Sequence, residues 1–196
     1  MNRIFSSTLL ALVAMLALTA CGSDNSGGSG GGDGSGGSDF NDADVTFAQS
    51  MIPHHEQAVE MAKMGKMQAS SPEVKNLANK IESAQGPEIA TLKGWLKDWA
   101  SEESDDSMGG MDHGSGMDRE MPGMMSDEEM AALEQATGAA FDKVFLTMMI
   151  EHHSGAIEMA QTEQADGKNA DAKALAKKIE TDQTAEISEM QKLLNS

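Results

Sequence analysis

Residues 51–62, MIPHHEQAVEMA, recur as residues 149–160, MIEHHSGAIEMA, and this repetition decides the fold class. The two segments are 98 positions apart (149 − 51), and the match continues at the same interval without a gap. Self-similarity at a fixed interval is typical of an internal duplication. We therefore expect a duplicated unit, with repeat 1 over residues 40–99 and repeat 2 over residues 126–196.

Each repeat is predicted to form a hairpin of two helices. In repeat 1, apolar residues and one histidine recur at steps of three and four, which defines one face of an α-helix: Phe47, Met51, His54, Ala58 and Met61. This helix is expected over residues 41–67. A second helix should begin at Ser71-Pro72-Glu73, because proline suits the first helical turn and an acidic residue suits the N-terminus.

The second repeat follows the same plan. Ser126 and Glu129 have the spacing of a capping box and predict a short lead-in helix. A long helix is expected over residues 145–164 and a last helix over residues 170–194. Since no stretch alternates with a period of two, the predicted fold class is all-α, a four-helix bundle built from two duplicated helical hairpins. The polar, Met-rich residues 100–125 are predicted to be a loop between the repeats.

The N-terminal segment has the features of an export signal. Residues 1–20 contain an apolar run that is too short to span a bilayer and that ends in Leu18-Thr19-Ala20-Cys21, a sequence like a bacterial lipobox. Cleavage before Cys21 and lipidation of its thiol would anchor the protein to the cell membrane, facing outside the cytoplasm. Residues 21–39 are rich in Gly and Ser and are expected to be a flexible tether.

Composition excludes several functions. The formal net charge of −18 argues against nucleic acid and against anionic lipid surfaces as partners, and favours cations. The single cysteine, Cys21, leaves no disulfide framework and no thiolate for catalysis. No motif for catalytic residues was found, so the chain is not expected to be an enzyme. Nothing in the sequence identifies a protein partner.

Paired histidines are the strongest chemical feature. Four of the five histidines form two adjacent pairs at equivalent places in the repeats, His54-His55 and His152-His153. Both members of each pair lie on apolar helical stripes and should point into the bundle. Methionines one turn before and two turns after the histidines extend the set of possible ligands: Met51, Met61, Met149 and Met159. Imidazoles and thioethers together favour Cu(I), Cu(II) or silver over calcium or magnesium.

Two other interpretations remain open. The histidines could be structural, bonded to Glu60 and Glu158 from neighbouring helices, in which case the protein would be a membrane-tethered interaction or scaffold protein. A redox enzyme that uses the metal is a third class. Haem is not expected, because the chain has no Cys-x-x-Cys-His attachment motif.

The segment between the repeats predicts a second, weaker metal site. A loop offers its methionines no core to fill, which favours soft-metal binding by these residues: Met108, Met111, His113, Met117, Met121, Met124 and Met125. We expect binding at the histidine site to weaken below the usual His pKa of about 6.5, whereas thioether binding should persist in acid.

These motifs resemble a known family. The stretches Met51-Ile52-Pro53-His54-His55 and Met149-Ile150-Glu151-His152-His153, with Glu-Met-Ala after each, are similar to the two halves of the domain of unknown function 305 family. The resemblance covers residues 40–194. It implies a ferritin-like helical fold, export, and often a lipid anchor, and some members are linked to copper binding and resistance. By resemblance, the metal positions are the histidines and methionines of these two stretches.

Overall fold

The structure is a computed structural model that describes residues 39–106 and 121–196. It contains five helices: α1 (Asp42–Gln68), α2 (Pro72–Asp106), α3 (Asp127–Gln135), α4 (Gly138–Asp166) and α5 (Ala170–Leu194). No strand occurs within these two ranges, so the all-α fold class is confirmed. Cys21 and the residues from Met108 to Met117 lie outside the described residues. Within the described ranges, no helix is both long and apolar enough to cross a membrane.

The helix ends follow local sequence signals. The side chain of Asn41 accepts hydrogen bonds from the first turn of α1, and the Asp44 carboxylate accepts one from the backbone N–H of Asn41, which completes a capping box. Ser126 and Glu129 form the predicted capping box of α3. The expected starts of α2 and α5 are also confirmed. Caps decide helix ends because they satisfy amide groups that have no partner inside the helix.

Two helices are longer than expected. The second helix continues to Asp106, so residues 100–106 are helical rather than loop. Just before this extension, Trp99 stacks on Phe40, with ring centroids 5.0 Å apart. The fourth helix begins at Gly138, where a positive φ of 61° separates it from α3. Glycine adopts this backbone conformation at little cost, which explains the break.

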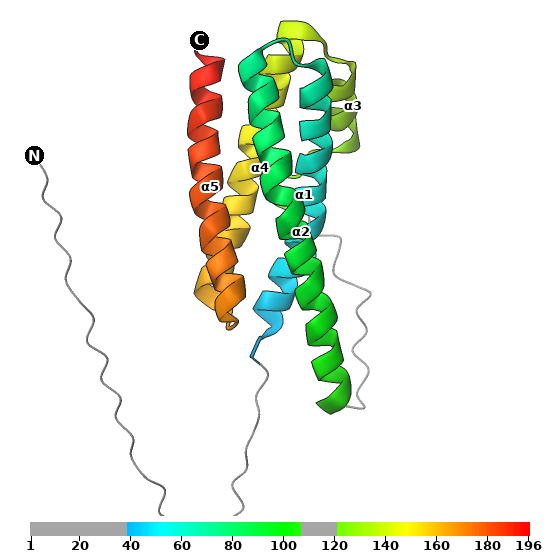
Figure 1. Ribbon diagram of the computed structural model, residues 1–196, viewed down its shortest axis with the longest axis vertical. Helices are drawn as coiled ribbons and strands as arrows, with labels where there is room; N and C mark the ends of the chain where they lie inside the picture. The colour runs from blue at the N-terminus through cyan, green and yellow to red at the C-terminus, as the bar shows by residue number, and fades with distance from the viewer. Residues whose placement is uncertain (1–38, 107–120) are drawn as a thin grey trace, which may run out of the picture. The chain divides into compact units, whose positions relative to one another are not determined.

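The four long helices pack as two hairpins, α1 with α2 and α4 with α5, joined mainly through α1 and α4 (Figure 1). Packing is antiparallel across the α1–α4 interface, because Met51 shares an apolar cluster with Ala156, whereas Met149 shares the other cluster with Ala58. The short α3 contacts α1 and α4. This arrangement brings the two His-His segments together at the middle of the bundle.

A polar layer crosses the bundle between the two apolar clusters. One cluster contains Ile81 of α2 and the other contains Leu92, and the two buried residues between them, Gln85 and Glu88, are polar. On α5 the buried residue between Ile179 and Met190 is Gln183, which is also polar. The layer consists of four positions in two copies: His54, His55, Gln85 and Glu88, with His152, His153, Gln183 and Glu186. All are buried except Glu186, which is half-buried.

Each repeat also fastens the hairpin loop of the other. The Asp142 carboxylate accepts backbone hydrogen bonds from Ser70 and Ser71, both at 2.9 Å. At the equivalent position, Asp44 accepts from the amides of Lys168 at 3.1 Å and Asn169 at 2.9 Å. These bonds fix the ends of the two long His-bearing helices relative to each other.

Candidate metal centre

His54 of α1 and His152 of α4 meet at the centre of the polar layer. Their ring centroids are 3.8 Å apart with an interplanar angle of 39°. Both side chains are completely buried. The two residues occupy the same position in the two repeats, so the antiparallel packing of α1 on α4 places equivalent imidazoles against each other. The prediction that the histidines point into the bundle is confirmed.

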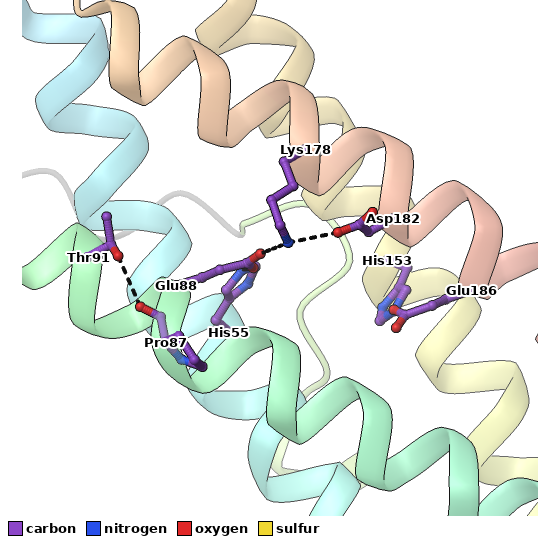
Figure 2. A network of polar contacts seen from close by, with 8 residues as sticks. All are labelled: His55, Pro87, Glu88, Thr91, His153, Lys178, Asp182 and Glu186. Atoms are coloured by element: carbon purple, nitrogen blue, oxygen red, sulfur yellow. Dashed lines mark hydrogen bonds and ion pairs between the residues drawn. The ribbon is translucent and has the colours of Figure 1, made fainter. Parts of the chain in front are cut away.

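The second histidine of each pair has a carboxylate partner. His55 Nε2 lies 2.9 Å from Glu88 Oε2, and His153 Nε2 lies 2.7 Å from Glu186 Oε2. Figure 2 shows Lys178 of α5 reaching Glu88 of α2, at 2.9 Å, while it also bonds Asp182 on its own helix at 2.8 Å. The His55 side therefore has a continuous chain of charged partners across two helices.

The prediction that Glu60 and Glu158 are the hydrogen-bond partners of the histidines is wrong. Both side chains are exposed and point away from the layer. Each lies five residues after His55 or His153, which turns it through about 500° on a helix and so away from the buried face. The actual partners come from α2 and α5, where Glu88 and Glu186 are also equivalent in the two repeats.

A short strap, residues 121–125, crosses over the histidine pair. The carbonyl oxygen of Pro122 lies 3.0 Å from His54 Nε2. Gln57 of α1 holds the end of the strap with two bonds of 2.8 Å to the backbone of Met125. At the crossing point a Cβ on Gly155 would lie 1.9 Å from the Pro122 oxygen, so the strap can pass over α4 only because residue 155 is glycine.

The hydrogen bonds determine which ring nitrogens are free. A carbonyl or carboxylate oxygen only accepts, so Nε2 of His54, His55 and His153 must be the protonated nitrogen. Their Nδ1 atoms then carry lone pairs, and these atoms are buried with no hydrogen-bond partner among the described residues. His152 has no such partner on either ring nitrogen. Five buried imidazole nitrogens without partners are an unusual feature that suits a ligand absent from the polypeptide.

Burial keeps the central imidazoles neutral. Loss of solvent and the nearby His55 lower the pKa of His54 from 6.5 to about 3. Burial, together with His54, also holds the pKa of His152 well below its usual value. For Glu88, burial raises the pKa, but the bonds from His55 and Lys178 outweigh this effect and lower it overall. Neutral imidazoles can bind a metal, whereas protonated ones cannot.

The structure separates the predicted methionine ligands into two groups. Met51 and Met149 are fully buried one turn before His54 and His152, directly beside the histidine layer. The other two helical methionines, Met61 and Met159, pack two turns after His54 and His152 in or against the apolar clusters.

The methionines of the strap differ from expectation in one respect. Met121 and Met124 are half-buried on either side of Pro122 and Gly123, next to the histidine pair. Met125 is buried in an apolar cluster with Leu133 and Met149. The premise that this segment has no core to fill is therefore wrong for Met125, which packs as an ordinary core residue.

A complete metal site is not preformed by acidic and histidine side chains alone. Within residues 39–106 and 121–196, no three His, Cys, Asp or Glu side chains surround a common point. A metal in the layer therefore needs thioether ligands as well, or a rotation of the stacked His54 and His152 rings.

Four polar residues of the layer were missed in the sequence: Gln85, Glu88, Gln183 and Glu186. The signal that would have found them is the repeat itself, because each polar residue interrupts an apolar helical stripe at the same place in both copies. Pro122 was also missed, and it had no such signal, since the strap has no counterpart in the other repeat.

Fold and site together define a class of protein: an all-α bundle of two helical hairpins with a duplicated, buried histidine layer. The chain belongs to the DUF305 family, a domain of unknown function, whose family model matches residues 44–194. This confirms the resemblance seen in the sequence. A comparison with curated proteins found no match.

Solved structures of the same family are similar to this chain. A DUF305 protein from Streptomyces coelicolor, inferred to be secreted, is 32% identical with a TM-score of 0.67, over 78% of this chain and 92% of that one. CopM in its Cu(I)-bound form is 30% identical with a TM-score of 0.62, over 78% and 95%. CopM has also been solved with silver bound, at 30% identity, a TM-score of 0.60 and coverage of 78% and 94%. Metal binding therefore occurs within this family.

Proposed function

We propose that this protein binds Cu(I) or Ag(I), and also Cu(II), and sequesters the metal outside the cytoplasm in metal homeostasis or resistance. The proposed ligands are His54 and His152 with the thioethers of Met51 and Met149. His55 and His153 complete the layer, and Glu88 and Glu186 orient their rings. The protein acts as a metal carrier or store rather than as an enzyme.

The unpartnered imidazole nitrogens carry this proposal. Burying a polar atom without a hydrogen bond costs about 1–3 kcal/mol, so a set of such atoms at the centre of a bundle needs a compensating ligand. Imidazole nitrogen is a common metal ligand, and the buried thioethers beside it favour soft metals such as Cu(I) and Ag(I). Related structures with Cu(I), Cu(II) and silver support the same choice of metal.

The hydrogen bonds of the layer suit metal binding in a second way. A metal-binding histidine usually donates its other ring N–H to a carboxylate or carbonyl, which fixes the tautomer and the ring orientation. Glu88, Glu186 and the Pro122 carbonyl are acceptors of this kind for His55, His153 and His54. His152 has no such partner and is the ring that is free to turn toward a bound ion.

The Met-rich segment is proposed as the weaker site. Met121 and Met124 lie in the strap beside the histidine pair, and the remaining candidates lie outside the described residues: Met108, Met111, His113 and Met117. Thioethers in this segment would collect soft cations near the layer. Lipidation at Cys21 and export belong to the same proposal, and the description of the Streptomyces coelicolor relative supports export.

Metal titration of three variants tests the proposal. We expect His54→Gln/His152→Gln to bind Cu(I) and Ag(I) at least tenfold more weakly than the parent, in competition with a chromophoric chelator at pH 7. Met67→Ala is the matched control, because Met67 is a methionine of α1 that is 73% exposed and outside the layer. Deletion of residues 107–120 should remove the weak binding contributed by Met108, Met111, His113 and Met117 and leave the histidine site unchanged. A folded His54→Gln/His152→Gln protein with parental affinity would refute the histidine site.

One observation favours a second function, a membrane-tethered scaffold with structural histidines. His55 is already satisfied by Glu88, which Lys178 in turn neutralises, as expected of a structural network. In this case the His54→Gln/His152→Gln protein would lose stability and no metal affinity. Measuring unfolding and metal binding on the same samples therefore distinguishes the two functions.

A further inference from the structure

Glu163 is a buried carboxyl group near the C-terminal end of α4 that the proposed metal site does not use. It is only 1% exposed. Neither of its carboxyl oxygens has a hydrogen-bond donor from another residue among the described residues. The polar group that it contacts is the carboxyl group of Asp44 on α1. Two carboxylates repel each other, so this contact requires one shared proton.

Glu163 holds that proton. Asp44 accepts backbone hydrogen bonds from Asn41 at 2.6 Å, Lys168 at 3.1 Å and Asn169 at 2.9 Å, and amide donors stabilise the ionised form. Burial raises the pKa of Asp44, but these bonds and the one from Glu163 lower it overall. Burial and the neighbouring Asp44 raise the pKa of Glu163 from 4.5 to about 8.

The contact lies directly under the loop that joins α4 to α5. A Cβ on Gly167 would lie 2.2 Å from Glu163 Oε1, so the loop passes against the carboxyl group. The next two residues, Lys168 and Asn169, are the ones that donate to Asp44. The loop is thus held to the start of α1 through Asp44, and Glu163 is in contact with both.

The charges around Glu163 do not neutralise a second carboxylate. Asp166 on α4 disfavours its ionisation and Lys173 on α5 favours it, and the effect of Lys173 is smaller than that of Asp44. Asp42 of α1 adds a further acid at the adjacent cavity of about 290 Å³, which Glu163 also lines. Loss of the proton would place the negative charge of Glu163 against that of Asp44.

We propose that Glu163 and Asp44 form a proton-dependent latch, which holds the α4–α5 loop to the start of α1 and loosens when the shared proton is lost. This latch acts at the end of the two helices that carry the histidine layer, and it does not depend on the proposed metal binding. Asp44 cannot serve instead as a cation site, because backbone N–H donors occupy both of its oxygens.

The other repeat contains an equivalent contact between an aspartate and a loop, but it lacks the carboxyl group that would hold a proton. Asp142 holds Ser70 and Ser71 as Asp44 holds Lys168 and Asn169. The residue equivalent to Glu163 is Gly65, and the three atoms nearest to a Cβ there belong to the apolar Ala78 and Phe145. The fold therefore carries a proton-sensitive loop and a matched insensitive loop, one at each end of the bundle.

Amide exchange measured by NMR on the metal-free full chain tests this latch. The readout is the protection of the Lys168 and Asn169 amides divided by that of the Ser70 and Ser71 amides, each corrected for its intrinsic exchange rate. A carboxyl group whose pKa is raised on closing binds its proton more tightly in the closed state. Protection of the sensitive loop should then fall as pH rises from about 5 to about 8, by up to about tenfold per pH unit, and level off above.

The variant Glu163→Gln keeps a hydrogen-bond donor for Asp44 and does not titrate. We expect its protection ratio to stay constant from pH 5 to pH 9. A wild-type ratio that does not change with pH would overturn the latch, and so would an equal fall at all four amides. If the variant showed the same pH dependence as the wild type, another group would be responsible. The wild-type measurement stands even if the variant does not fold.

Discussion

His54 and His152 stack on each other with ring centroids 3.8 Å apart, although they are 98 positions apart in the chain (152 − 54). Because both residues occupy the same place in a duplicated unit, antiparallel packing of the units brings like residues together at the centre. Duplication thereby concentrates four imidazoles in one layer from a single His-His motif. The same duplication places Gln183 at the position equivalent to Gln85 and provides each of His55 and His153 with a carboxylate.

Replacing His152 should show that this residue serves metal binding and does not stabilise the fold. The variant His152→Met removes two buried nitrogens that have no partner, so we expect its unfolding free energy to be equal to the parent or higher by about 1 kcal/mol. The control His55→Met leaves Glu88 without its buried partner and should lose about 2 kcal/mol. Urea denaturation measures both, and equal losses would mean that His152 has a structural role.

Acid should destabilise the metal-free protein through its buried histidines. In the folded state the pKa of His54 is about 3, whereas in the unfolded chain it is near 6.5. As pH falls below about 6.5, only the unfolded chain takes up this proton, so stability is present above that pH and is lost toward pH 3. The slope is about 1.4 kcal/mol per pH unit for each such histidine. We expect urea midpoints to fall over this range, and His54→Gln to show a smaller slope.

The same lowered pKa revises the expected pH dependence of metal binding. The sequence alone suggested that binding at the histidines weakens below about pH 6.5. Since burial holds the pKa values of His54 and His152 well below that value, these rings stay neutral in moderate acid. Silver binding at pH 5 should therefore remain close to that at pH 7 as long as the protein stays folded. A tenfold loss between these two pH values would contradict this expectation.

The crossing of the strap over α4 should depend on Gly155. A Cβ at this position would lie 1.9 Å from the Pro122 oxygen, so Gly155→Ala must push the strap away from His54. We expect a loss of about 2 kcal/mol in unfolding free energy and faster proteolysis at residues 121–125. The control is Gly94→Ala in α2, where a Cβ meets nothing within 4 Å and the gain in helix propensity should add about 1 kcal/mol. Similar losses in both variants would refute the steric argument.

Lipid anchoring should depend on Cys21. We expect Cys21→Ser to leave an unprocessed precursor without diacylglycerol, because the lipobox cysteine is both the lipid acceptor and the residue after the cleavage site. Stable attachment needs more than one acyl chain, which the lipidated cysteine would supply. Mass spectrometry and membrane fractionation compare the two forms. A serine variant that is processed and held at the membrane like the parent would contradict the lipobox.

Local features of the sequence were predictable because their physical causes are local. Steps of three and four between Phe47, Met51 and His54 predicted one buried helical face, and all three residues are buried. The capping box of Ser126 and Glu129 predicted a helix start that the structure has. The length of α2 was underestimated, because the polar residues 100–106 were assigned to the loop and the helix continues through them to Asp106.

The partners of the histidines were not predictable in the same way. Glu60 and Glu158 were chosen because they are near the histidines in sequence, yet the helical period points both of them outward. Glu88 lies 33 positions after His55 and reaches it only because α1 and α2 pack side by side. Met125 was assigned to a loop, but Gln57 holds its backbone against α1 and its side chain enters the core.

The sequence by itself determined the duplication, the helical class and the inward direction of the two His-His pairs, since each follows from spacing along one chain segment. Only the tertiary structure decided that His54 meets His152, that Glu88 and Glu186 are the carboxylate partners, and that Glu163 lies against Asp44. These relationships depend on the angle and register at which helices pack, and that geometry results from the fit of many side chains at once.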